Sequence, residues 1–340
     1  MGGSLEKFDI KMDIKDRKIL LELEKDSRQT NSQIAKKVGM SPQNVAYRIN
    51  NLEKQGILHG FWAVIDYQKL GFNCNNIFLK LKDLNSNEEK ELIEHLKNVK
   101  GVSWIAQTIG RWDIMLAFLY ENLNDFNEIF TNICNKYHSK IQDYQIVPNL
   151  DNYPLSCKLL YDDFKNVEIP HIVCGEQKNV KIDGVDHALL KELTNNARAS
   201  IIELSNKLGV MPKTLKNRMN RLMNEGVVQA FRPAIDYNKL GYQWRICFLQ
   251  VANFKKSEKK RFMSYAKLHP SITYLVNTIG HNINVDILTQ HDDHFLEIKS
   301  DLHKDFKDFI KNFEIVNVAK IHKRDFLPKK LEDIHDNQKL

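Results

Sequence analysis

The sequence predicts an α+β fold in which a small helical head and a mixed body of strands and helices occur twice along the chain. Residues 16–72 and 186–242 align without a gap at a constant offset of 170, and 19 of the 57 paired positions are identical. Each copy is followed by segments of strand and helix pattern in the same order. At 340 residues the chain is also too long for one ordinary core, so we expect two similar units.

Composition narrows the class of protein. Hydrophobic residues make up 42% and charged residues 27%, which is typical of a folded domain rather than a disordered chain. No apolar run approaches the ~18 residues of a membrane span, and the N-terminus has no hydrophobic signal region. Five cysteines without a C-x-x-C pair argue against a disulfide framework or a structural zinc site. We therefore expect a cytoplasmic protein with no membrane partner, no metal and no cofactor.

Each head reads as a helix-turn-helix followed by a wing. In the first copy Gly39 is suited to the end of a helix, because glycine adopts a positive φ at little cost. Ser41 then caps the next helix and Pro42 occupies its first turn. This short turn between two helices is typical of DNA-binding heads. Gly56 ends the helix, and residues 57–67 read as an extended wing.

The helix after Pro42 separates into two faces at 100° per residue. Val45, Ile49 and Leu52 cluster on one side and are expected to face the core, as are Leu215, Met219 and Leu222 in the second copy. Polar and basic residues point away, which suits base edges and phosphates. The residues predicted to contact DNA are Ser41, Gln43, Asn44, Tyr47, Arg48, Asn51 and Lys54 in copy one, and Lys213, Thr214, Lys216, Asn217, Arg218 and Arg221 in copy two.

The two outward faces differ in charge. Residues 41–54 hold two basic groups and one acid, whereas residues 211–224 hold four basic groups and no acid. Each neutralised phosphate makes binding stronger and more sensitive to salt. Copy two is therefore predicted to supply most of the affinity for DNA, and copy one to discriminate between sequences. Met211 replaces the Ser41 cap, which costs about 1 kcal/mol of helix stability. The alternative is a duplicate that has drifted, whose lysines form only a solvated surface.

The segment after each head predicts a βαββαβ order, the ferredoxin-like arrangement. In the first unit the last strand is expected at 141–147, and in the second unit at 315–322. One face of such a sheet holds helices and the other is free to pack against another sheet. The predicted domains are 12–72 (head), 73–150 (body), 151–182 (linker), 183–242 (head), 243–328 (body) and 329–340 (polar tail).

Head, wing and body in this order resemble the Lrp/AsnC family of transcriptional regulators. The matching segments include 16–20, 33–41, 48–57 and Leu70-Gly71. Thr108-Ile109-Gly110-Arg111-Trp112-Asp113 resembles the family's T-G-x-x-D loop between the middle strands of the body. The resemblance therefore implies bodies of the effector-binding RAM type. The resemblance covers nearly the whole chain, twice over.

The resemblance implies double-stranded DNA as partner, pairing through the bodies, further homo-oligomeric assembly, and an amino-acid effector held near that loop. Fusing two units departs from the family pattern of one unit per chain and makes one chain a pseudo-dimer. In the second unit Ile283 stands where the first has Asp113, so a carboxylate is absent there. Gly110 and Asp113 are the effector-binding candidates; the alternative is that Gly110 serves a tight turn and Asp113 only caps it.

Other functions on this fold stay open. Some proteins resembling this family are sirohaem decarboxylases, which rely on His and Arg around a tetrapyrrole. The only cluster of that kind here is His281 with His291-Asp292-Asp293-His294, which also reads as a polar turn with Asp292 or Asp293 capping a helix. A co-regulator that barely touches DNA is a further alternative.

The expected function is sequence-specific DNA reading, not enzymatic catalysis. Helices 42–55 and 212–225 would enter major grooves about one turn, roughly 34 Å, apart, on two unlike half-sites. Arg48 and Arg218 recur at one place, which favours phosphate contacts; the competing interpretation is an ion pair with a carboxylate of the head such as Asp16 or Asp186.

Overall fold

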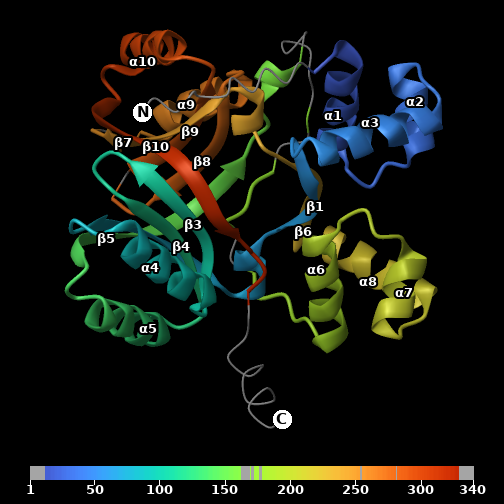
Figure 1. The fold of residues 1–340 in the computed structure, drawn as a ribbon, viewed down its shortest axis with the longest axis horizontal. Helices are drawn as coiled ribbons and strands as arrows, with labels where there is room; N and C mark the ends of the chain where they lie inside the picture. Colours follow the sequence, from blue (N-terminus) through green and yellow to red (C-terminus); the bar gives the residue numbers. More distant parts are fainter. Residues whose placement is uncertain are drawn as a thin grey trace.

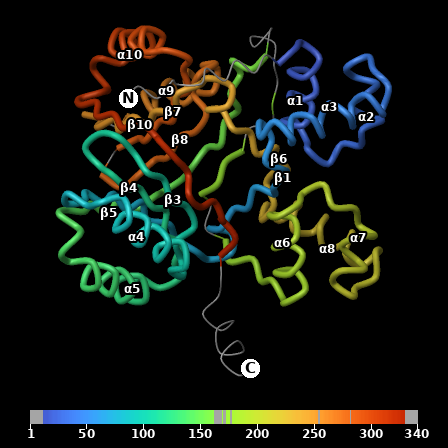
Figure 2. Tube along the Cα trace, viewed as in Figure 1, coloured from blue at the N-terminus to red at the C-terminus, as the bar shows by residue number. Residues whose placement is uncertain are grey.

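A computed structural model describes residues 12–161, 169, 172–175, 178–252, 255–280 and 282–328. Both heads lie on one side of the molecule and both bodies on the other (Figures 1 and 2). The predicted order of elements is confirmed in both units. The predicted polar tail, 329–340, and His281 lie outside the described residues.

The helices of the two units correspond one to one. In the heads they are α1 (Ile14–Lys25), α2 (Asn31–Val38) and α3 (Pro42–Lys54), then α6 (Gly184–Asn195), α7 (Ile201–Leu208) and α8 (Pro212–Asn224). In the bodies they are α4 (Ser86–Asn98), α5 (Leu123–Lys136), α9 (Lys256–Leu268) and α10 (Asp292–Phe306). Within the described part of the chain, no helix combines the length and apolar character that crossing a membrane requires.

The strands divide into a pair between the heads and a larger sheet in the bodies. The wings are β1 (Leu58–Ile65) and β6 (Val228–Ile235), which pair antiparallel with each other. The body strands are β2 (Asn73–Leu81), β3 (Val102–Ile109), β4 (Ile114–Tyr120) and β5 (Ile141–Pro154), then β7 (Gln243–Val251), β8 (Ile272–Thr278), β9 (Asn282–Thr289) and β10 (Ile310–Arg324).

The body strands form one closed sheet, in the order β10-β3-β4-β2-β5-β8-β9-β7. The prediction of short final strands is wrong: β5 extends to Pro154 and β10 begins at Ile310 and runs to Arg324. The first half of β5 pairs with β2 of its own unit, and the second half with β8 of the other. In the same way β10 pairs first with β7 and then with β3. The extra length is the part that the other unit supplies with hydrogen-bond partners.

Apolar clusters lie on both sides of this sheet. Helices α4 and α5 cover one outer core, which includes Leu92 and Phe130, and α9 and α10 cover another, which includes Phe262 and Leu302. Inside the closed sheet a third cluster brings together residues of both units, among them Phe78. The bodies therefore share one interior.

The predicted linker begins too early. Residues 151–154 belong to β5, and Asn152 forms an isolated bridge with Cys174, whose side chain packs on the wing residue Val64. Leu160 and Tyr161 are buried in the core of the heads. Parts of this connection are therefore built into the structure because the wings offer apolar surface that they cover.

Candidate nucleic-acid interface

In each head, the first helix of the helix-turn-helix ends and the second begins at the predicted residues. Gly39 and Gly209 adopt φ of 66° and 65° directly after α2 and α7. The Ser41 hydroxyl accepts a hydrogen bond from the Asn44 amide at 3.2 Å, whereas Met211 makes no side-chain cap. The predicted inward sets, Val45, Ile49, Leu52 and Leu215, Met219, Leu222, are the buried residues of α3 and α8.

The residues predicted to contact DNA all reach the surface. Tyr47 is 65% exposed, which leaves its ring available to a partner. Also exposed are Ser41, Gln43, Asn44, Lys54, Lys213, Lys216, Asn217 and Arg221, while Arg48, Asn51, Thr214 and Arg218 are half-buried. The two recognition faces are accessible as the helical wheels predicted.

The recurring arginines are engaged within the heads. Arg48 Nη1 lies 2.7 Å from Asp13 Oδ2 and 2.8 Å from Asp16 Oδ1. Arg218 makes the same pair with Asp183 at 2.7 Å and Asp186 at 2.9 Å. Hydrogen bonds to Asp16 and Asp13 raise the pKa of Arg48, and those to Asp186 and Asp183 raise that of Arg218. The ion pair left open by the sequence is thus present, and a phosphate contact by either arginine stays a prediction.

This pairing reduces the charge difference between the two helices. Arg221 also bonds to Asp186, whose side chain is only 1% exposed. Two of the four cations of α8 therefore hold α8 to α6. Among the described residues, Lys213 and Lys216 form no ion pair, so they are the cations of α8 most accessible to phosphates.

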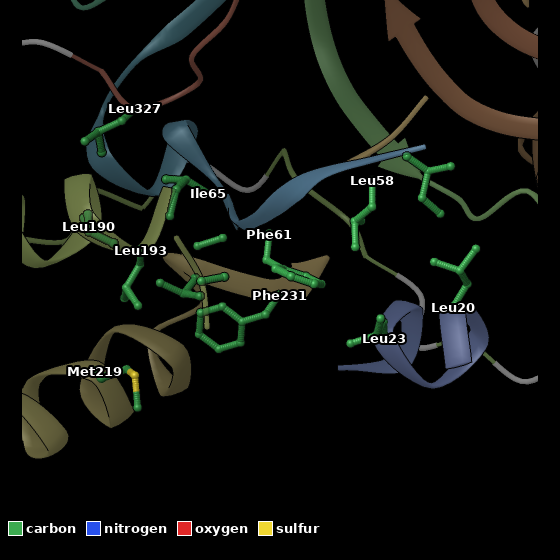
Figure 3. Close-up of a cluster of buried hydrophobic side chains, with 14 of the residues drawn as sticks. Leu20, Leu23, Leu58, Phe61, Ile65, Leu190, Leu193, Met219, Phe231 and Leu327 are labelled. Carbon is green, nitrogen blue, oxygen red and sulfur yellow. The ribbon is translucent and has the colours of Figure 1, made fainter. Parts of the chain in front are cut away.

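The heads are fixed to each other by reciprocal hydrogen bonds, in which donor and acceptor of one bond correspond to those of the other at the offset of 170. The amide of Ser27 donates to Phe231 O at 3.1 Å, and the amide of Ala197 donates to Phe61 O at 2.9 Å. Likewise Asp66 N donates to Val227 O and Asp236 N to Ile57 O. Figure 3 shows Phe61 and Phe231 between the helices of the two heads. The wings thus set the position of one recognition helix relative to the other.

A pair of arginines completes this head interface. Arg28 reaches across to donate to Ala197 O and Ala199 O, and its guanidinium lies 5.4 Å from the centre of the Phe231 ring. Arg198 donates to Asn31 Oδ1 at 2.8 Å and lies 5.1 Å from the Phe61 ring. Burial lowers the pKa of both arginines. Sequence reasoning missed their role, although their recurrence at the offset of 170 was a signal.

The candidate effector loop has its carboxylate occupied. Asp113 Oδ2 accepts from the Leu81 amide at 2.7 Å and Oδ1 from Lys80 Nζ at 3.0 Å. Gly110 has φ of 149°, and a Cβ there would lie 3.2 Å from Ile315 O. Both residues therefore have structural tasks: Asp113 ties the loop to β2, and Gly110 permits close approach of β10. Effector binding by them stays a prediction.

The histidine cluster forms a helix cap. His291 Nδ1 accepts from the His294 amide at 3.2 Å, so His291 caps α10 and the prediction of Asp292 or Asp293 as the cap is wrong. Asp292 pairs with Arg245 instead. In the described residues no group of three or more His, Cys, Asp or Glu side chains is arranged to hold a metal ion.

Comparison with known proteins agrees with this geometry. The family model described as winged helix-turn-helix DNA-binding matches residues 12–58 and 182–229, one match in each head. An uncharacterised HTH-type transcriptional regulator of Pyrococcus furiosus is 30% identical over 119 residues, which are 35% of this chain and 79% of that relative. The regulatory protein AsnC of Haemophilus influenzae is 29% identical over 119 residues, or 35% of this chain and 78% of AsnC.

Fold, matched segments and recognition faces together define a winged helix-turn-helix DNA-binding protein with two heads. Its one-unit relatives each align with about a third of the chain, as a tandem duplication requires. The chain belongs to the Lrp/AsnC family of DNA-binding transcriptional regulators.

One solved structure matches the duplicated chain end to end. The crystal structure of the siroheme decarboxylase NirDL superposes with a TM-score of 0.61 at 11% identity, covering 95% of this chain and 96% of that one. At this identity the likeness concerns the fold alone.

Proposed function

We propose that the chain regulates transcription as a single-chain pseudo-dimer, in which α3 and α8 read two unlike half-sites on double-stranded DNA. The observation that supports this most directly is the reciprocal head interface, which holds two exposed recognition helices in one fixed relation. Dimeric readers need this relation, because their helices must match the repeat of the DNA helix.

Differences between the outward faces support unlike half-sites. At corresponding positions, copy one presents Gln43, Asn44, Tyr47 and Asn51, and copy two presents Lys213, Thr214, Asn217 and Arg221. Amide side chains suit bidentate contacts to adenine, whereas lysine suits guanine or phosphate. The operator should therefore be an imperfect palindrome.

A selection from random duplexes, followed by a face exchange, tests the proposal. The wild-type chain should select two different half-sites about one helical turn apart. The quadruple variant Lys213→Gln, Thr214→Asn, Asn217→Tyr and Arg221→Asn gives α8 the outward face of α3 and should select two similar half-sites. The matched control, Lys256→Gln with Lys260→Gln, removes charge from α9 and should leave the selected sequence unchanged. Identical half-sites for the wild-type chain would contradict the proposal.

We also propose that the chain is not an enzyme. The likeness to NirDL favours a tetrapyrrole enzyme only at the level of the fold. Among the described residues, the cavity between the wings and the closed sheet has a volume of about 220 Å³ and no histidine in its lining. A larger cavity of about 530 Å³, lined in part by the first body and α6, includes one histidine, His187. Sites for drug-sized ligands occupy about 300–1,000 Å³, and a tetrapyrrole with its acidic side chains is at the large end of that range. A Soret-band shift on adding iron uroporphyrin, saturating at one equivalent, would contradict this.

Assembly beyond one chain is a separate part of the proposal. Because the described body strands close into one sheet, they offer no free edge to a second chain. A homo-oligomer would then form through helices or loops. Sedimentation velocity over a range of concentrations would detect it, and a single species of one chain would contradict it.

A further inference from the structure

A cavity of about 220 Å³ lies where the wings meet the closed sheet. Its lining comes from both wings, including Trp62 of β1 and Arg232 of β6, and from both halves of the closed sheet, including Trp104 and Trp244. The rings of Trp104 and Trp244 lie 6.5 Å apart at an angle of 50°. Both wings and strands of both units therefore contribute to this one cavity.

Arg324, at the end of β10, is a cation of this cavity that forms no ion pair within 4 Å among the described residues, although Asp286 acts on it electrostatically. Its side chain is part of the cavity lining and also reaches the surface, and burial lowers its pKa. Its guanidinium lies 5.9 Å from the centre of the Trp62 ring. No carboxylate of the described residues lies within ion-pair distance of it, in contrast to Arg48 or Arg218. A guanidinium that lines a cavity and has no ion-pair partner is suited to hold a carboxylate there.

The buried acids of the cavity do not take that place. Asp286 accepts a hydrogen bond from Trp244 Nε1 at 3.1 Å, and burial raises its pKa to about 7. Glu24 accepts from Ser156 Oγ at 2.7 Å and lies 3.8 Å from Arg232, and burial raises its pKa as well. Both acids are thus engaged by other side chains, and neither lies within ion-pair distance of Arg324, although the charge of Arg324 favours the ionised form of Asp286.

A second polar atom points to the rest of the ligand. Asn149 Nδ2 donates to Cys74 Sγ and to Asn76 Oδ1, but its own Oδ1 is buried and accepts no hydrogen bond from any described residue. A buried acceptor without a donor costs stability, and a ligand N–H would remove that cost. Asn149 lines the same cavity as Arg324.

Volume limits the size of the ligand. A cavity of about 150 Å³ holds one benzene ring, so this cavity fits roughly 10 to 13 non-hydrogen atoms. From these observations we propose that the cavity binds a heteroaromatic carboxylate of about the size of indole-3-carboxylate, with its carboxylate on Arg324, its ring against the tryptophans and its N–H toward Asn149. This site is separate from the Gly110–Asp113 loop, whose carboxylate is already engaged.

The location gives such a ligand a means to act on the heads. It would contact β1 and β6 on one side and the closed sheet on the other, so its binding would favour one position of the paired wings relative to the bodies. This consequence rests on the proposed DNA-binding function, whereas the binding itself does not.

Titration calorimetry on the full-length chain without DNA tests the binding. Three matched probes separate the contacts: indole-3-carboxylate, indole-3-carboxamide, which lacks the charge, and 1-naphthoate, which lacks the N–H. We expect the carboxylate to bind about 10- to 100-fold more tightly than the carboxamide, and more tightly than the naphthoate. Arg324→Gln should abolish the preference for the carboxylate. The matched control Arg261→Gln removes an exposed arginine that lies over Phe306 and should leave all three affinities unchanged.

Equal affinity for carboxylate and carboxamide, or no heat with any probe up to about 1 mM, would overturn the proposal. Crystals soaked with 4-iodobenzoate provide a readout that does not depend on a variant that folds. An anomalous peak among Trp62, Trp104 and Trp244 supports the site, and a peak only on the outer surface refutes it. Loss of DNA binding with intact ligand binding would instead point to failure of the proposed function alone.

Discussion

Replacing Arg28 with alanine should weaken the attachment of the two heads more than replacing Arg198. Both arginines lie over a phenylalanine ring of the opposite wing, at 5.4 and 5.1 Å, so the cation–π contribution of about 0.5–1 kcal/mol is common to both. Arg28 donates two hydrogen bonds to backbone carbonyl groups across the interface, whereas Arg198 donates one to Asn31 Oδ1.

The magnitude follows from that count. A hydrogen bond with a charged donor contributes about 1.5–3 kcal/mol, and these side chains are only half-buried, so the lower end of this range applies. Arg28→Ala should cost about 3–4 kcal/mol and Arg198→Ala about 2 kcal/mol. The difference of about 1.5 kcal/mol is the more reliable quantity, because common terms cancel.

Urea unfolding followed by circular dichroism measures both free energies of unfolding. DNA binding provides the second readout, since Arg28→Ala should weaken binding to a complete operator while leaving binding to an isolated half-site unchanged. The conservative variant Arg28→Lys keeps the charge but not the fork of donors, and should recover less than half of the loss. Equal unfolding free energies for the two alanine variants, or a larger cost for Arg198→Ala, would refute this account of the interface.

Further predictions concern caps, phosphate contacts and pH. Met211→Ser should stabilise the second head by about 1 kcal/mol and Ser41→Ala should destabilise the first by a similar amount, as thermal unfolding would detect; no gain from the new serine would contradict the capping argument. Lys213→Ala should lower the slope of log K against log salt by about 0.9, whereas Arg218→Ala should lower it by less and also reduce stability, because Asp186 loses a partner; an equal change in slope would favour a phosphate contact by Arg218. Burial lowers the pKa of His269 to about 4 from 6.5, so its contribution to stability is complete above pH 6.5 and is lost as the pH falls toward 4. The variant His269→Gln should flatten the stability curve between these two pH values, and an unaltered curve would assign the acid sensitivity to other groups.

Much of the fold was predictable because the ends and the buried faces of the helices are determined by residues within the same short segment of sequence. Gly39 and Gly209 end helices through their own backbone freedom, and Val45, Ile49 and Leu52 identify a buried face through the helical period alone. The length of β5 was not predictable in this way. Residues 149–154 become a strand only because β8, more than a hundred residues later, supplies their hydrogen-bond partners.

In the candidate site, too, the features with a local cause were predictable and those that depend on distant residues were not. Exposure of Gln43, Tyr47 and Lys213 follows from the wheel, and the structure has each of them at the surface. The ion pairs of Arg218 depend on Asp183 and Asp186, which lie 35 and 32 residues away at the start of α6. The helical period does not predict a contact between residues so far apart in the sequence. The recurrence of Asp13 and Asp16 as Asp183 and Asp186, at the offset of 170, was the signal that could have identified these partners.

The crossing of β5 and β10 between the units has a consequence for how this protein can change. In an assembly of two identical chains every substitution occurs at both symmetric positions, so a change that improves one side is also imposed on the other. Here each final strand is completed by a partner within the same polypeptide, and the two halves are always present in equal number. Ser41 and Met211, or Asp113 and Ile283, can therefore differ without a second gene. Two unlike units encoded separately would also form homodimers beside the heterodimer, whereas the fused chain always pairs one unit with the other.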